Sequence, residues 1–173
     1  MWAVREDSSF EAFVAARGTA LLRLARLLCR DPDDAEDVCQ TALERAYRSW
    51  RRVHATRDPE PYVRRILVNL VISRARRARL LTFVPLRSVP EPPAPGQPAG
   101  VEVRDELMRG LRALPARQRA VLVLRYWEDL SEAEVARLLD CSVGSVKSHA
   151  SRGLARLRTL VDAGLLEGVG EKR

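Results

Sequence analysis

The proline-rich stretch from Val84 to Gly100 constrains the fold more than any other feature of the sequence. It contains six of the ten prolines, and two glycines lie among them. Because proline has no backbone N–H donor and a fixed φ angle, such a stretch supports neither a long helix nor a sheet. We therefore expect a flexible linker over residues 81–102, with small domains at residues 8–80 and 103–163 and a fraying tail at residues 164–173.

Apolar residues recur at helical spacing on both sides of this linker, and no useful length of sequence alternates as a strand does. In the N-terminal half, helices are expected over residues 10–28, 34–50 and 59–79, with a loop over residues 51–58. In the C-terminal half, helices are expected over residues 103–114, 116–126, 132–139 and 143–161. The sequence therefore predicts an all-α fold made of two small helical domains.

The last two of these helices match a helix-turn-helix. Ser131 and Glu134 form the pattern of a capping box, and Ser142 is expected to cap the next helix after a break at Asp140. In such a motif the second helix enters the major groove of DNA, where it needs hydrogen-bonding side chains. Residues suited to that role are Lys147, Ser148, His149, Ser151 and Arg152. The alternative is a solvated surface helix. Residues expected to pack inward are Val146, Leu154 and Leu157.

Positive charge predicts a polyanionic partner, although an inert basic surface remains possible from charge alone. Lys and Arg outnumber Asp and Glu by 30 to 23, which gives a formal charge of +7. The third helix ends in an arginine cluster suited to phosphates and carries an aromatic and an amide suited to unpaired bases. The residues concerned are Tyr62, Arg64, Arg65, Asn69, Arg74, Arg76, Arg77 and Arg79. Tyr62 could instead belong to the core.

An acidic stripe on the second helix predicts a protein partner. Asp33, Asp37, Gln40 and Glu44 fall at spacings that place them on one helical face. On the other side of this helix, Ala35, Val38, Ala42 and Ala46 are expected to face the core. In an otherwise basic chain, an acidic face suits a protein better than DNA, although a merely solvated face has the same spacing.

Several classes of function find no support in the residues. Cys29, Cys39 and Cys141 form no C-x-x-C pair and have no histidine at ligand spacing, so we expect ordinary reduced cysteines and no metal, with a redox switch as the alternative. No nucleophile is paired with a histidine and no glycine-rich phosphate loop occurs, so we expect neither an enzyme nor a cofactor. No apolar run could span a bilayer and no signal peptide begins the chain, so we expect a cytoplasmic protein without membrane insertion.

Four segments resemble RNA polymerase sigma factors of the extracytoplasmic-function class, most closely the actinobacterial SigE-type subfamily. Asp34–Trp50 is similar to region 2.2, and Pro61–Asn69 with the following arginines is similar to regions 2.3 and 2.4. Leu114–Arg125 and Val135–Ser148 are similar to region 4. The segments occur in the family's order and cover nearly all of residues 10–160.

The resemblance implies a sigma factor that binds core RNA polymerase, recognises the minus-thirty-five and minus-ten promoter elements, promotes melting and directs transcription of a specific regulon. Residues implied to bind core polymerase are Asp33, Glu36, Asp37, Gln40, Thr41 and Glu44. Residues implied to bind the minus-ten element, melted non-template strand included, are Tyr62, Arg64, Arg65, Asn69, Ser73, Arg74, Arg76 and Arg77. Residues implied to bind the minus-thirty-five duplex are Lys147, Ser148, His149, Ser151 and Arg152.

Three positions depart from the family pattern and put the promoter preference in doubt. Tyr62 stands where tryptophan is frequent, His149 where arginine is common, and Ser73 where an acid is frequent. The resemblance also implies a possible anti-sigma factor, a linker that runs toward the RNA exit channel, and two halves that move freely before polymerase binds. Two alternatives remain: a stand-alone helix-turn-helix regulator, and an adaptor whose main partner is another protein.

Overall fold

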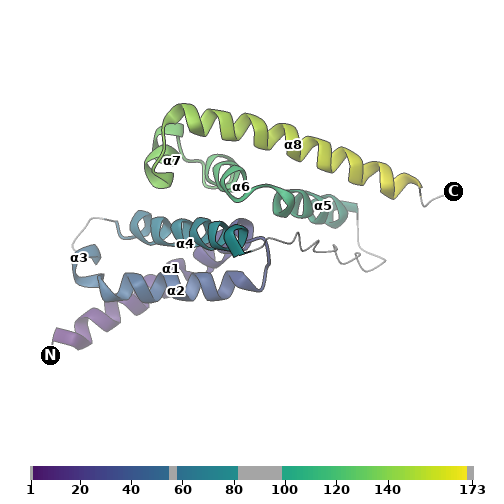
Figure 1. Cartoon of the computed structure of the whole chain (residues 1–173). Coiled ribbons are helices and arrows are strands. Elements are labelled where there is room, and N and C mark those ends of the chain that lie inside the picture. Colours follow the sequence, from purple (N-terminus) through teal and green to yellow (C-terminus); the bar gives the residue numbers. More distant parts are fainter. Residues whose placement is uncertain (1, 55–57, 82–98, 171–173) are drawn as a thin grey trace.

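The computed structural model describes residues 2–54, 58–81 and 99–170. Within these ranges the chain consists of helices and turns without a strand, which confirms the all-α prediction (Figure 1). Residues 82–98, which make up most of the predicted linker, lie outside the described residues, so the linker remains a prediction there.

The N-terminal half contains α1 (Trp2–Leu28), α2 (Asp34–Arg48), α3 (Trp50–His54) and α4 (Glu60–Leu81). Acidic residues occupy the first turn of α2, where they stabilise the positive end of the helix dipole. The predicted inward side of α2 is confirmed, because Ala35, Val38, Ala42 and Ala46 are all buried. The small alanines let α2 approach α1 and α4 closely, and Leu24, Leu67 and Val63 fill the space between them.

The short helix α3 corrects the predicted loop over residues 51–58. Trp50 is buried, and its indole N–H donates a hydrogen bond of 2.8 Å to Ser9 Oγ on α1. The Phe10 and Phe13 rings lie 5.0 Å and 5.1 Å from the Trp50 ring. These contacts hold the start of the segment against α1, so one helical turn forms where the polar composition suggested a loop.

The C-terminal half contains α5 (Ala99–Ala113), α6 (Ala116–Leu122), the π-helical turn η1 (Val123–Trp127), α7 (Glu132–Leu139) and α8 (Val143–Gly170). Two helices extend into ranges that the sequence analysis gave to the linker and the tail. Residues 99–102 belong to α5 rather than to the linker, and α8 continues through most of the expected fraying tail. Its glycines do not end α8, because each further residue adds a hydrogen bond once a helix has formed.

The capping box and the helix break are present as predicted. Ser131 Oγ accepts from Glu134 N–H at 3.2 Å, and Glu134 Oε2 accepts from Ser131 N–H at 2.7 Å. Asp140 then adopts a left-handed conformation with φ of 51°. Ser142 Oγ caps α8 by accepting from Ser145 N–H at 3.1 Å. The geometry of a helix-turn-helix therefore follows directly from these four polar residues.

The two halves pack against each other, which corrects the expectation that they move freely. In Figure 1, α6 and α7 lie over α4, and α1 contacts α5, α6 and η1. The buried apolar residues form one continuous cluster across both halves. Two small cores therefore become one larger core, which a short chain needs for stability.

Arg119 lies at the junction of the two halves and is only 2% exposed. Its Nε donates to the carbonyl of Leu28 at 2.8 Å, and its Nη1 donates to the carbonyls of Arg112 and Leu114 at 3.0 Å and 3.3 Å. These carbonyls end α1 and α5, where helices lack internal donors. Burial lowers the pKa of Arg119 to about 10, so the guanidinium remains charged at neutral pH.

Replacing Arg119 should destabilise the whole chain. Arg119→Met keeps the length of the side chain but removes the donors to three carbonyls, and we expect a loss of about 3 kcal/mol in the free energy of unfolding. Urea denaturation followed by circular dichroism measures this loss. Arg117→Met, at an exposed position of the same helix, is the matched control and should change stability by less than about 0.5 kcal/mol. Equal effects of the two variants would contradict this role of Arg119.

Candidate functional site

One face of α4 carries five of the predicted minus-ten residues. Tyr62, Arg65, Asn69, Ser73 and Arg76 follow one another at steps of three or four residues, so they lie along one side of the helix. Arg65, Asn69 and Arg76 are exposed, and Ser73 is half-buried. Tyr62 is 41% exposed, so it is available for stacking instead of filling the core. We call these five residues the α4 face.

Arg64 lies on a different side of α4 and faces the C-terminal half. Its Nη2 is 2.7 Å from Glu60 Oε1 and 3.0 Å from Glu128 Oε2, which follows η1. The Arg64 side chain is 15% exposed and that of Glu128 is 17% exposed. Arg64 is therefore one of three predicted minus-ten residues outside the α4 face, together with Arg74 and Arg77.

Arg74 also forms an ion pair within the chain. Its Nη2 lies 2.6 Å from Asp37 Oδ2 on α2, so the predicted DNA-binding and polymerase-binding residues meet here. Both side chains are substantially exposed, so this pair contributes little to stability. Arg77 is exposed beyond it. The arginine cluster at the end of α4 thus presents positive charge beside the acidic face of α2.

A cavity of about 270 Å³ opens beside Tyr62. Ser49, Arg52, Val53 and Tyr62 line it, so it lies between the α2–α3 junction and the start of α4. The residues that separate α3 from α4 in sequence include 55–57, which lie outside the described residues. The sequence analysis did not identify Ser49 and Arg52, because only the fold brings them next to Tyr62.

The acidic stripe of α2 is exposed, as its spacing predicted. Asp33, Glu36, Asp37, Gln40 and Glu44 are all on the surface, and Thr41 is half-buried. Gln40 Nε2 donates to Glu44 Oε1 at 3.2 Å, and this bond fixes two of these side chains relative to each other. Glu36 pairs with Arg26 on α1 at 3.2 Å.

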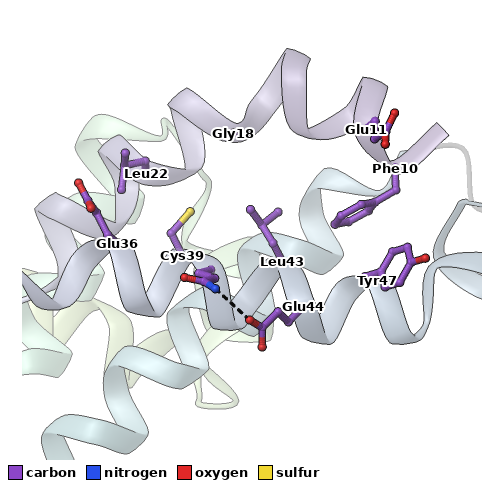
Figure 2. A pocket seen from close by; sticks show the side chains of 10 residues that line it. Phe10, Glu11, Gly18, Leu22, Glu36, Cys39, Leu43, Glu44 and Tyr47 are labelled. Atoms are coloured by element: carbon purple, nitrogen blue, oxygen red, sulfur yellow. Dashed lines mark hydrogen bonds between the residues drawn. The ribbon is translucent and has the colours of Figure 1, made fainter. Parts of the chain in front are cut away.

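A groove of about 620 Å³ runs along this stripe between α1 and α2. Figure 2 shows Cys39 and Leu43 pointing from α2 toward α1, with the aromatic rings of Phe10 and Tyr47 at one end. The floor is therefore apolar. Carboxylates line its edges, namely Glu11, Glu36 and Glu44. We call this feature the α1–α2 groove; its apolar residues escaped the sequence analysis because their spacing also fits a core.

The predicted DNA-reading helix is the start of α8. Lys147, Ser148, Ser151 and Arg152 are exposed on one side, as predicted, while Val146 is fully buried. Lys147 Nζ lies 3.7 Å from Glu132 Oε2 on α7. Of the residues predicted to pack inward, Leu157 is partly buried against the core, whereas Leu154 differs from the prediction. Leu154 is 44% exposed, and Gly153 is buried in its place, where an added Cβ would lie only 3.2 Å from Leu122.

His149 sits at the edge between the exposed and buried sides of α8. It is half-buried, and its Nδ1 is enclosed without a hydrogen-bond partner among the described residues. Burial lowers the pKa of His149 first, and the positive charges of Arg117 and Arg152 lower it further. His149 is therefore neutral at pH 7, and the positive charge on this part of α8 comes from Lys147 and Arg152.

Neither a cluster of metal ligands nor a membrane-spanning helix is found among the residues that the structure describes. No group of three or more metal-ligating side chains gathers among the described residues. None of the helices in those ranges is long and apolar enough to cross a bilayer. Cys29, Cys39 and Cys141 are free cysteines, and burial raises the pKa of Cys29 to about 11 and also raises that of Cys39. Cys29 and Cys39 are therefore thiols rather than reactive thiolates at neutral pH.

Comparison with protein families supports a division into the same two helical halves. Residues 13–80 match the family model described as sigma-70 region 2, and residues 104–157 match sigma-70 region 4. The chain is 44% identical to the RNA polymerase sigma-E factor of Streptomyces coelicolor over 88% of its own length and 86% of that protein. It is 34% identical to the ECF RNA polymerase sigma factor SigM of Mycobacterium tuberculosis, over 88% of this chain and 77% of that one.

Two solved structures also resemble this chain in fold. The sigma factor RpoE of Bartonella quintana, solved with the anti-sigma factor NepR, superposes with a TM-score of 0.69 at 25% identity and covers 89% of this chain and 97% of that one. CnrH, solved with the cytosolic domain of CnrY, gives a TM-score of 0.58 at 25% identity. The match covers 91% of this chain and 90% of CnrH. The class defined by the fold and its faces is a sigma-70 protein with regions 2 and 4. Within that class, this chain belongs to the extracytoplasmic-function RNA polymerase sigma factors.

The lowered pKa of His149 can be measured directly. In an NMR pH titration, His149 should titrate below pH 6.5, because burial penalises its charged form. Since the folded pKa lies below the unfolded value, stability is complete above about pH 6.5 and falls as pH drops through the folded pKa. The control His149→Gln should lack this decline. Titration of His149 above pH 6.5 would contradict the enclosed geometry.

Proposed function

We propose that this chain binds core RNA polymerase, recognises the minus-thirty-five and minus-ten promoter elements, promotes melting and directs transcription initiation of a specific regulon. The observation that carries the proposal is the separation of three exposed surfaces: the acidic side of α2, the α4 face, and the start of α8. Each has the chemistry of a different partner. A stand-alone DNA-binding regulator would leave the acidic surface and its groove unused.

The α1–α2 groove and the acidic stripe are the surface for core polymerase. An apolar floor with carboxylates at its edges suits a helix that carries an apolar stripe between lysines and arginines. Such a helix would insert its apolar residues between Leu43 and Leu22 and place its basic residues against Glu36 and Glu44. The proposed polymerase contacts are Asp33, Glu36, Asp37, Gln40, Thr41 and Glu44.

The α4 face binds the melted minus-ten element. Tyr62 offers a ring for stacking, Asn69 an amide that can hydrogen-bond to a base edge, and Arg65 and Arg76 charges for phosphates. The cavity beside Tyr62 is the natural place for a base that has left the stack. Ser73 belongs to this face, Arg74 and Arg77 extend it, and Arg64, paired with Glu60 and Glu128 on another side of α4, is the remaining proposed contact.

The start of α8 reads the minus-thirty-five duplex. Lys147 and Arg152 can contact guanine edges or phosphates, and Ser148 and Ser151 can donate or accept hydrogen bonds. His149, neutral and half-buried, adds a hydrogen bond or an apolar contact at the groove edge. The capped turn before α8 orients these side chains.

Melting follows from differential binding, and the chain itself performs no covalent chemistry. A protein shifts an equilibrium only if it binds one state better than the other. Unstacking a base costs a few kcal/mol, which stacking, amide and phosphate contacts can offset. We place the protein in the cytoplasm, where core polymerase is found. Because the solved structure of RpoE contains the anti-sigma factor NepR, an anti-sigma factor is a proposed further partner.

The polymerase surface is tested by charge reversal. Glu44→Lys puts a positive charge at the edge of the α1–α2 groove and should weaken binding to purified core polymerase at least about tenfold. Fluorescence anisotropy of the labelled chain measures the dissociation constant. Asp105→Lys, an identical charge change at an exposed position of α5, should leave it unchanged. If both variants bind core alike, the groove is not the polymerase surface.

The minus-ten surface is tested with two templates. Asn69→Ala should reduce run-off transcription from a linear duplex promoter roughly tenfold, because a contact to an unpaired base is lost. On a template whose minus-ten region is mismatched and already open, most activity should return. Thr19→Ala, an exposed position on α1, is the control with parental activity on both templates. Parental transcription by Asn69→Ala on the duplex would refute the assignment.

A further inference from the structure

We propose that a backbone phosphate of duplex DNA binds where α6 meets α8, between the guanidinium groups of Arg117 and Arg152 and beside the Nε2 atom of His149. We call this place the α6–α8 subsite. The inference rests on the proposed contact of α8 with duplex DNA, and it adds Arg117, a residue of α6 that the sequence analysis did not identify. Its ligand is a phosphodiester, which every base sequence supplies, so the subsite fixes the position of α8 on the duplex.

A close contact between α6 and α8 brings Arg117 to the edge of the DNA-reading helix. Gly153 is buried at this contact, and a Cβ added there would lie 3.2 Å from Leu122 and 3.4 Å from the Cβ of Gln118. Arg117 precedes Gln118 and is exposed. His149 lies one turn before Gly153 on the same side of α8. The charge of Arg117 therefore acts on His149 from the neighbouring helix.

The charge around this imidazole is positive and lacks a counter-ion. Arg117 of α6 and Arg152 of α8 are the charged groups that act on His149, and no carboxylate of the described residues joins them. Both arginines are exposed, and neither forms an ion pair within the described part of the chain. Two like charges repel each other, so an anion between them is stabilised by both. Guanidinium groups also match the geometry of phosphate oxygens.

The imidazole adds a hydrogen-bond donor. The Nδ1 atom of His149 is enclosed without a partner among the described residues, whereas Nε2 is not enclosed in this way. An N–H group buried without an acceptor is rarer than a buried atom that lacks a donor, so the proton of the neutral ring belongs on Nε2. From there it can be donated to a phosphate oxygen.

The position of the subsite beside α8 fits a phosphate of the groove wall. The major groove is about 12 Å wide, and a helix with its side chains is about 10–12 Å across, so a helix that enters the groove lies between two rows of phosphates. Lys147 and Ser151 extend from α8 itself and can contact base edges. Arg117 extends from the helix next to α8, where a groove wall is the nearest part of the DNA.

The first test counts phosphate contacts. It uses the full chain and a mixed-sequence duplex of about 30 base pairs, because a phosphate contact does not require a promoter sequence. Fluorescence anisotropy at several salt concentrations gives the dissociation constant and its salt dependence. Arg117→Gln removes the proposed contact from α6, and Arg152→Gln removes the one from α8. Arg109→Gln, the same change at an exposed position of α5, is the matched control.

We expect Arg117→Gln to weaken duplex binding roughly fivefold at low salt and to lower the slope of log affinity against log salt by about 0.9, as one lost phosphate does. Arg152→Gln should behave in the same way, and Arg109→Gln should bind like the parent.

The second test locates the phosphate with NMR. Adding the duplex should raise the pKa of His149 in the parental chain, because a nearby anion stabilises the charged imidazole. The rise should be smaller in Arg117→Gln. If Arg117→Gln keeps the parental slope and the parental rise while Arg152→Gln lowers the slope, the subsite is refuted and the contact of α8 with duplex DNA stands. If neither variant changes the slope and the duplex leaves His149 unaffected, both the subsite and the proposed role of α8 fail.

Discussion

The hydrogen bonds of the buried Arg119 guanidinium connect the ends of α1 and α5, and the packing of the two halves depends on them. A buried charge is tolerated only when polar groups surround it, and here three helix-terminal carbonyls do so. The same carbonyls would otherwise lie buried without donors. At this junction the guanidinium therefore gains acceptors and the carbonyls gain a donor. The same contacts align α6 and η1 with α1 and α4.

This alignment arranges the functional surfaces. It leaves the acidic side of α2 and the α1–α2 groove open, exposes the α4 face, and turns Arg64 inward against Glu128. The proposed polymerase-binding surface is therefore accessible in the packed chain, whereas Arg64 is mostly enclosed.

Periodicity and capping rules predicted most of the local structure. The alanine-rich side of α2, the capping box at Ser131 and the exposed residues of α8 were all found where the spacing placed them. What the sequence could not reveal depends on contacts distant along the chain. Nothing local marks Arg119 as buried, Glu128 as the partner of Arg64, or Leu154 as exposed while Gly153 packs inward, because each outcome depends on how the halves meet.

The central claim is that core polymerase binds the acidic side of α2 and the α1–α2 groove. Hydrogen–deuterium exchange of the free chain and of the chain bound to core polymerase tests it most directly. We predict slower exchange on binding in the segment from Asp37 to Glu44, which borders the groove. Unchanged exchange across this segment would contradict the account.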